Sequence, residues 1–520
     1  MLHLLFLLVV FLINNIKTSQ TLNAAILKQK VSAALQPENI HIALGDTSQD
    51  IVVMWASGRE EDYFVEYAED VNNMQRVNSE MAVLEESSKR CLKYLYRAHL
   101  SNLRPGVKYL YRIVGKSGFN SNPFAFTVPK TRKGIVHTFM VLADMGLSSK
   151  SLPMLAYEAA TGIYEAVFHL GDIAYDLHHD EGNIGDLFQK KVAQFSSTIP
   201  YMTVPGDHER FLNFAHYRYR FSMPNTRWPM PPDQLWYSLG VGPIYFITLN
   251  TEVFYSVPDQ LDKHMTWLRD EFWKVNRNRE QHPWLIVLGH KPLYSSAVDG
   301  DEEDTERDCS SEATCNIRSK LEDFFYEQGV DLYICGHRHN YERTWPTYRM
   351  KSFQQNYKNP KAPIYITIGA MGHEYVTDSI VKQAVWSAFS TDSQKELYGK
   401  LEVLNATHLM WDVYAASNNE KVDSVLIVQW SHGTFGKPGE DAYEKMMHLK
   451  HLPPAPLGWH PQSKPQESQG WVYDALFSLP PSVRKVYLGT VCLTLLTIIC
   501  CLLAMPCFRK RICRKYSLLV

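Results

Sequence analysis

The sequence lacks the compositional extremes that mark many specialised proteins. It has only nine Cys, 27 Gly and 27 Pro in 520 residues, which excludes a disulfide knot and a collagen-like chain. Its 53 Lys and Arg nearly balance its 55 Asp and Glu, so we expect no nucleic acid partner. Internal repeats are also missing. Because the chain is too long for one ordinary hydrophobic core, we expect two or three domains.

Long hydrophobic runs are scarce, and the two that stand out lie near the ends of the chain. Residues 2–13 are apolar apart from His3 and have the length of a signal-peptide core, although no Lys or Arg precedes them. They predict a signal peptide over residues 1–24, with a buried N-terminal helix as the alternative. Residues 486–505 carry no charge and are long enough to cross a bilayer. They predict a C-terminal transmembrane helix.

The residues around the second run predict how the protein is oriented. Basic residues gather in 506–520, which indicates a cytoplasmic tail and argues against a lipid-anchor signal. Residues 452–485 are rich in proline and predict a stiff stalk. We therefore expect a type I single-pass membrane protein of the secretory pathway, exposed at the cell surface or inside an endolysosome. The sequon at residues 405–407 predicts a glycoprotein that is glycosylated at Asn405.

Between these ends the pattern of hydrophobic residues changes once. Over residues 33–130, short strand-like runs such as 51–55 and 108–114 alternate with turn signals, which predicts a fibronectin III-like β-sandwich. Over residues 135–432, nearly continuous apolar runs are separated by segments of helix length. This second pattern is typical of an α/β domain whose sheet is covered on both faces.

Polar residues follow the apolar runs of the second region, at the strand ends where open α/β sheets bind ligands. A single Asp at such a place is more often a helix cap than a ligand, but a succession of Asp and His at strand ends predicts one shared site. So many carboxylates would repel one another without a cation. Oxygen and nitrogen donors suit Fe, Zn or Mn, and their number suffices for two ions. The candidate residues are Asp144, Asp172, Tyr175, Asp207, His208, His290, His337 and His339.

These blocks resemble the motifs of the purple acid phosphatases, within the calcineurin-like metallophosphoesterase superfamily. They read Asp-x-Gly at 144–146, Gly-Asp-x-x-Tyr at 171–175, Gly-x-His-Glu at 206–209, Val-x-x-His at 287–290 and Gly-His-x-His at 336–339. The tyrosine is what marks the purple branch. The resemblance implies a two-sheet metallophosphoesterase sandwich flanked by helices, and it extends to the N-terminal sandwich but excludes the stalk and the span.

The resemblance also implies a role for each candidate residue. Asp144, Asp172, Tyr175 and His339 would hold a ferric ion. Asp172 would bridge to a second, divalent ion (Zn, Fe or Mn) that is also bound by Asp207, His290 and His337. A hydroxide on the metals would attack a phosphate monoester without a phosphoenzyme, best at acidic pH. His208 would contact the phosphate or help the alcohol to leave.

The sequence departs from the family pattern at two places. Asp207 stands where the family has Asn, and we expect weakened phosphate binding or an altered preference for the second metal; the alternative is a substitution without consequence. Residues 291–301 lack the His pair that plant members carry after the position of His290. Two other functions stay open, namely a phosphodiester or nucleotide hydrolase that uses the same site, and a weakly active cell-surface binding protein, which Asp207 favours. The oligomeric state and the physiological substrate are open as well.

Overall fold

The computed structural model describes residues 35–70, 72–85, 92–131, 134–297, 312–372, 380, 383–391 and 395–437. The predicted signal peptide, stalk, transmembrane helix and cytoplasmic tail lie outside these ranges. Within the ranges, no helix combines the length and the apolar character that crossing a bilayer requires. Of the nine cysteines, Cys335 is described as a free and buried thiol.

The N-terminal region is a β-sandwich, as predicted. One four-stranded antiparallel sheet has the order β1-β2-β6-β5, and the other has the order β4-β3-β7-β8. Alternate side chains of β7 point inward, and Trp55 of β2 stacks on Tyr96 of β6 with 5.5 Å between ring centroids. The strands are β1 (Glu38–Leu44), β2 (Ile51–Ser57), β3 (Tyr63–Ala68), β4 (Gln75–Asn78), β5 (Glu80–Glu85), β6 (Leu92–Leu100), β7 (Lys108–Gly115) and β8 (Phe124–Thr127).

The following region is an α/β domain built on two mixed sheets, which confirms the predicted class. The six-stranded sheet has the order β11-β10-β9-β21-β22-β23, and the seven-stranded sheet has the order β12-β13-β14-β15-β19-β16-β20. Their strands are β9 (His137–Leu142), β10 (Ala166–Leu170), β11 (Tyr201–Val204), β12 (Ser238–Val241), β13 (Ile244–Thr248), β14 (Trp284–Leu288), β15 (Leu332–Cys335), β16 (Tyr341–Thr344), β19 (Ile364–Ile368), β20 (Ser387–Thr391), β21 (Leu397–Val403), β22 (His408–Ala415) and β23 (Glu420–Val428). A small hairpin is formed by β17 (Thr347–Tyr348) and β18 (Lys351–Ser352).

The core of this domain lies between the two sheets. Phe246 of β13 packs against Phe139 of β9 and Phe168 of β10, with ring centroids 5.1 Å and 4.7 Å away. The strands β9, β10, β13 and β14 are buried along their whole length. Such strands read as continuous apolar runs, which explains why the sequence pattern revealed them.

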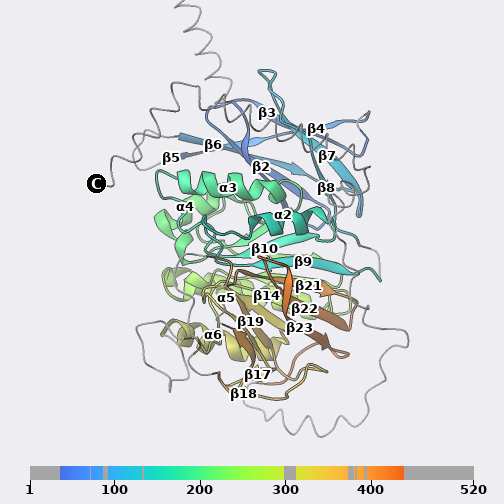
Figure 1. The fold of residues 1–520 in the computed structure, drawn as a ribbon, viewed down its shortest axis with the longest axis vertical. Coiled ribbons are helices and arrows are strands. Elements are labelled where there is room, and N and C mark those ends of the chain that lie inside the picture. The colour runs from blue at the N-terminus through green and yellow to red at the C-terminus, as the bar shows by residue number, and fades with distance from the viewer. Residues whose placement is uncertain are drawn as a thin grey trace, which may run out of the picture. The chain divides into compact units, whose positions relative to one another are not determined.

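Helices cover the outer faces of both sheets (Figure 1). On the six-stranded sheet lie α2 (Leu152–Ala160) and α3 (Asn183–Ser196), and α4 (Phe211–Arg220) follows β11. On the seven-stranded sheet, α5 (Leu261–Asn276) and α6 (Glu312–Gln328) bury Phe272 and Phe325 against β13 to β15. Short 3₁₀ turns are η1 (Asp207–Glu209), η2 (Thr251–Phe254) and η3 (Pro258–Gln260).

A polar contact fixes the N-terminal sandwich to the α/β domain. Asp186 of α3 accepts a hydrogen bond from Asn39 of β1 at 3.2 Å and forms ion pairs with Lys93 of β6 and with Arg220 of α4. The guanidinium of Arg220 is fully buried, and its nitrogen lies 2.7 Å from Asp186. Tyr111 of β7 also donates to the carbonyl of Ser197 at 2.7 Å. This contact joins residues that are far apart in the sequence, and the sequence did not predict it.

Candidate metal centre

The strand order of the two sheets brings the candidate residues to one place. Asp144 follows β9, Asp172 follows β10 and Asp207 follows β11, and these three strands are parallel neighbours in the six-stranded sheet. His290 follows β14 and His337 follows β15, and these two strands are parallel neighbours in the other sheet. The carboxyl ends of both parallel sets therefore face one site, as expected for ligand binding in α/β sheets.

Four of the candidates form a tight group, which we call the His290 cluster: Asp172, Asp207, His290 and His337. One ligand atom from each lies within 4.8 Å of the others. The Oδ1 atom of Asp207 lies 3.1 Å from Nε2 of His290 and 3.1 Å from Nδ1 of His337. Oδ2 of Asp172 lies 3.4 Å from Nε2 of His290. Two carboxylates and two imidazoles that converge in this way fit a divalent ion of the Zn, Fe or Mn type.

Three further candidates form a second group, the Tyr175 cluster: Asp144, Tyr175 and His339. The hydroxyl of Tyr175 donates to Oδ1 of Asp144 at 3.1 Å and lies 2.8 Å from Nε2 of His339. The Nε2 atom of His339 is 3.8 Å from Oδ1 of Asp144. A phenolate, a carboxylate and an imidazole are hard and borderline donors, so this group fits ferric iron.

Neighbouring backbone groups orient the donors of the His290 cluster. Nδ1 of His290 lies 2.8 Å from the carbonyl oxygen of Leu170, which accepts a hydrogen bond from this nitrogen and so turns Nε2 toward the carboxylates. Gly171 lies against the same ring at φ 85°, and a Cβ there would overlap the imidazole. A Cβ on Gly206 would overlap the carboxylate of Asp172 in the same way. The glycines beside the ligands are therefore required by close packing.

Four of the candidate ligands have an unusual backbone conformation. Asp144, Asp172, Tyr175 and His337 have φ values of 59°, 50°, 45° and 69°, a region that residues other than glycine rarely adopt. Such conformations persist only where the surroundings enforce them, and they gather at functional sites. The strain supports the view that the two clusters form one built site.

The pKa shifts of the site indicate that its carboxylates are stabilised by nearby positive charge. Burial raises the pKa of Asp144 well above its usual value, and the nearby charge of Asp172 raises it as well. Burial alone would also raise the pKa of Asp207, but hydrogen bonds from His290 and His337 outweigh burial and lower it. Burial would lower the pKa of His290, yet the charge of Asp172 raises it well above the usual value. A cationic imidazole of His290 thus helps to balance the carboxylates, and a metal ion would replace its proton.

His208 lies at the edge of the site rather than in either cluster. Its backbone N–H donates to Oδ1 of Asp172 at 3.1 Å, and its Nε2 atom lies 3.9 Å from Oδ2 of the same residue. Nδ1 of His208 lies 2.9 Å from Asp176. Burial would lower the pKa of His208, but the charge of Asp172 and the hydrogen bond with Asp176 outweigh burial and raise it.

Several supporting residues carry no role in the sequence-based prediction. The buried carboxylate of Glu209 accepts hydrogen bonds from the backbone N–H groups of Asp172 at 2.9 Å and Gly206 at 2.8 Å, which ties two ligand loops together. Burial and the charge of Asp172 raise the pKa of Glu209 to about 7. Lys291 forms an ion pair with Glu252 beside Asp207. Glu209 is the last residue of the motif at 206–209 and Lys291 directly follows His290, so the sequence offered a signal for both residues, whereas it offered none for Glu252.

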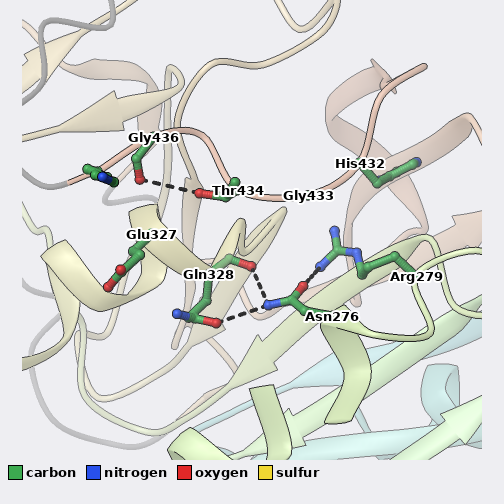
Figure 2. A pocket seen from close by; sticks show the side chains of 9 residues that line it. Asn276, Arg279, Glu327, Gln328, His432, Gly433, Thr434 and Gly436 are labelled. Atoms are coloured by element: carbon green, nitrogen blue, oxygen red, sulfur yellow. Dashed lines mark hydrogen bonds between the residues drawn. The ribbon is translucent and has the colours of Figure 1, made fainter. Parts of the chain in front are cut away.

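A separate cavity of about 680 Å³ lies between α5, α6 and residues 432–437. Figure 2 shows Asn276 bonded to Arg279 and to Gln328 at its wall. The guanidinium of Arg279 also pairs with Asp331 at 3.0 Å. The residues that line this cavity belong to neither cluster, so we assign it no part in the metal centre.

The glycosylation candidate Asn405 lies on the surface, far along the chain from the clusters. It is exposed, and its Oδ1 atom accepts hydrogen bonds from the backbone N–H of Thr407 at 2.8 Å and from the hydroxyl of Thr407 at 2.9 Å. An exposed turn is the usual setting of a glycosylated sequon. Glycosylation of Asn405 stays a prediction.

Comparisons with known proteins match the regions of the chain that hold the two clusters. The sequence model of the calcineurin-like phosphoesterase family matches residues 137–341. The model of the purple acid phosphatase N-terminal domain matches residues 37–128, and that of the iron/zinc purple acid phosphatase-like C-terminal region matches residues 362–424. Together the three models span the sandwich and most of the α/β domain.

Individual relatives show the same similarity. Acid phosphatase type 7 of Danio rerio is 36% identical to this chain over 78% of the chain and 94% of the relative. The Fe(3+)-Zn(2+) purple acid phosphatase 12 of Arabidopsis thaliana is 29% identical over 64% of the chain and 72% of the relative. The solved structure of a purple acid phosphatase from yellow lupin seeds shares the fold with a TM-score of 0.64, at 22% identity over 76% of this chain and 74% of that one.

Proposed function

Because this chain belongs to the purple acid phosphatase family of calcineurin-like metallophosphoesterases, we propose that it hydrolyses phosphate monoesters at a binuclear metal centre formed by its two clusters. The chain is an acid phosphatase of this family. The observation that carries the proposal is the convergence of Asp172, Asp207, His290 and His337 within 4.8 Å, next to the Tyr175 cluster. Asp172 is the residue that would join the two halves.

The donors of the two clusters differ in a way that suits two different ions. The Tyr175 cluster would hold ferric iron together with Asp172, since a phenolate favours a hard trivalent ion. The His290 cluster would hold a divalent ion, namely Zn, Fe or Mn, because its imidazoles and carboxylates suit borderline metals. When bound, the metals supply Lewis-acid activation of water and of the phosphate ester.

His208 is the residue that would handle the proton of the leaving alcohol. The hydrogen bond between Nδ1 and Asp176 at 2.9 Å turns the Nε2 atom toward the carboxylate of Asp172, at the edge of the site. Its raised pKa keeps the imidazole protonated at mildly acidic pH. A protonated imidazole at this place can donate a proton to the departing oxygen, which fits an acid phosphatase. Since the chain lacks the His pair of plant members, this role falls to His208.

Asp207 would bind the divalent ion through a carboxylate in place of the family's amide. The added negative charge lies where the substrate, itself an anion, must bind. We therefore keep the hypothesis that Asp207 weakens phosphate binding or changes the preference for the second metal.

For the cellular location we propose a type I single-pass membrane protein with an exoplasmic catalytic domain. The support is the uncharged run at 486–505 with its basic flank, the apolar N-terminal run and the exposed sequon at Asn405. Protease treatment of intact cells and vesicles, combined with glycosidase digestion, tests this orientation. A catalytic domain that is glycosylated and shielded in sealed microsomes is expected; an unglycosylated domain that is cleaved in sealed microsomes would contradict it.

The activity is tested on the purified full-length chain with a panel of phosphate esters. The panel contains an aryl phosphate, a nucleoside monophosphate, a nucleoside triphosphate and a bis-aryl phosphodiester, measured between pH 4 and 8 with metal content determined on the same sample. We expect monoesters to be hydrolysed fastest, with an acidic optimum. Faster hydrolysis of the diester would favour the phosphodiesterase alternative, and an inactive chain that holds two metal ions would contradict the proposal.

A further inference from the structure

A lysine lies beside the carboxylate that sets this chain apart from the family pattern. Nζ of Lys291 is 3.9 Å from Oδ1 of Asp207 and 3.1 Å from Oε1 of Glu252. Lys291 directly follows the candidate ligand His290 in the sequence, and it is only 9% exposed. Its ammonium group also lies 4.8 Å from the ring centroid of Tyr255. A nearly buried cation therefore faces the edge of the His290 cluster.

The backbone and the neighbours of Lys291 fix its position. Its N–H donates to the hydroxyl of Thr251 at 3.3 Å, and its carbonyl accepts from the hydroxyl of Tyr333 at 2.7 Å. Its partner Glu252 is fully buried in η2 and accepts a further hydrogen bond from Ser256 at 2.7 Å. Because both partners are held in place, the charge of Lys291 stays next to Asp207 instead of moving into solvent.

Two roles are open for the charge of Lys291 beside Asp207. A buried carboxylate such as Glu252 needs a partner, so Lys291 could serve Glu252 alone. Yet the same ammonium lies within 4 Å of Asp207, which brings a full negative charge to a site that must bind an anionic phosphoryl group. A fixed cation at this distance offsets that charge, because Coulomb interactions in a partly buried site are weakly screened.

We infer that Lys291 is a determinant of phosphate affinity: held by Glu252, it compensates the charge of Asp207 and so keeps the site able to bind phosphate esters. This inference rests on the proposed phosphatase function and deepens it. It predicts that the importance of Lys291 depends on the residue at position 207. If Lys291 served Glu252 alone, its importance would be the same with Asp or Asn at that position.

A double-mutant cycle on the full-length, metal-loaded chain tests this dependence. Since Lys291→Met alone leaves the buried carboxylate of Glu252 without a cationic partner, the cycle uses Lys291→Met together with Glu252→Gln, which removes both charges. This neutral pair is introduced into the wild type and into Asp207→Asn. The readouts are the dissociation constant of inorganic phosphate from calorimetry, the KM and kcat for an aryl phosphate, and the metal content of each variant.

We expect the neutral pair to weaken phosphate binding about tenfold in the Asp207 protein and less than about threefold after Asp207→Asn, with KM changing more than kcat. Lys291→Arg should retain phosphate affinity within about threefold, since it preserves the charge. An equal loss in both backgrounds would overturn the inference and leave Lys291 as the partner of Glu252 only. If the wild type hydrolyses no monoester, the proposed function fails, whereas the calorimetric cycle still decides the role of Lys291.

A second lysine–aspartate pair, outside the two clusters, serves as a control. Lys421 of β23 pairs with Asp412 at 2.7 Å, and its Nζ lies 5.5 Å from the ring centroid of Tyr414, so it has the same kinds of partner as Lys291. The variant Lys421→Met with Asp412→Asn removes this pair from a sheet edge outside the two clusters. Phosphate affinity should stay unchanged in it, and thermal unfolding of both neutral pairs reports whether the fold is intact. A loss of phosphate affinity in this control as large as in the Lys291 pair would count against the inference.

Discussion

The two clusters of the candidate centre differ in how closely they follow the family pattern. The Tyr175 cluster keeps the expected carboxylate, phenolate and imidazole, with Tyr175 within 3.1 Å of Asp144 and 2.8 Å of His339. The His290 cluster contains the departure, Asp207, and Lys291 lies against it. Only the cluster with the altered ligand thus has a lysine beside it among the ion pairs of the described residues. In this chain, the cluster that contains the added carboxylate is also the cluster with a buried lysine held beside it.

The largest effect is expected from removing a ligand at the centre of the His290 cluster. In His290→Ala the two carboxylates lose the imidazole that lies 3.1 Å from Asp207 and 3.4 Å from Asp172. The fall in kcat should exceed the roughly 100-fold loss that follows removal of an outer partner of a metal ligand. Steady-state kinetics and metal content check this. His432→Ala, at the separate cavity, is the control, and nearly unchanged kcat in His290→Ala would refute the ligand assignment.

A smaller effect is expected when only the Tyr175 cluster is changed. Tyr175→Phe removes the phenol oxygen and keeps the ring that packs 4.5 Å from the ring of His208. We expect kcat to fall about 10- to 100-fold, one metal ion to be lost and the visible absorption of a ferric phenolate to disappear. Elemental analysis and the absorption spectrum give the answer. Tyr164→Phe, a buried tyrosine bonded to Glu158, is the control. An intact visible band in Tyr175→Phe would exclude Tyr175 as the iron ligand.

A moderate effect is expected when position 207 is given the amide side chain of the family pattern. Asp207→Asn removes one negative charge. At ~4 Å and an effective dielectric of 20, this charge would repel a bound phosphate by up to ~4 kcal/mol. Metal binding and Lys291 offset most of this repulsion. We therefore expect the inhibition constant of inorganic phosphate to fall about tenfold. Inhibition constants measured at two ionic strengths check this expectation. An unchanged constant would mean that the substitution has no consequence.

The smallest effect concerns stability rather than catalysis. Asp186 joins the sandwich to the α/β domain through Lys93 and Arg220. Burial would raise the pKa of Asp186, but the charges of Arg220 and Lys93 outweigh it and lower the pKa. We expect Asp186→Asn to cost about 2 kcal/mol, between the values of surface and buried ion pairs, with kcat little changed.

The lowered pKa fixes the pH dependence of this contribution. A carboxyl whose pKa is lower in the folded chain stabilises above its unfolded value of about 3.9, and the gain disappears as pH falls through the folded value. The difference in melting temperature between wild type and Asp186→Asn should therefore be constant from about pH 5 to 7 and shrink below about pH 4. A difference that grows on acidification would contradict the ion-pair explanation.

The ligand positions were predictable because they are local features of the sequence. Asp172 and His290 stand directly after apolar runs, and such runs become buried parallel strands whose ends meet. The contacts of Lys291 were not predictable, because Glu252 reaches it only through the packing of η2 against the end of β14. The same holds for Asp186, whose partners come from three separate parts of the chain. Pairings of this kind depend on tertiary packing, which no local pattern encodes.

The proposed function requires that the two clusters act as one binuclear phosphatase site. It is tested most directly by stripping the metals from the purified full-length chain and following aryl phosphate hydrolysis as iron and a divalent metal are added back. We expect activity to be lost on stripping and to return until two ions are bound per chain. Full activity in the stripped protein, or saturation at a single ion, would contradict it.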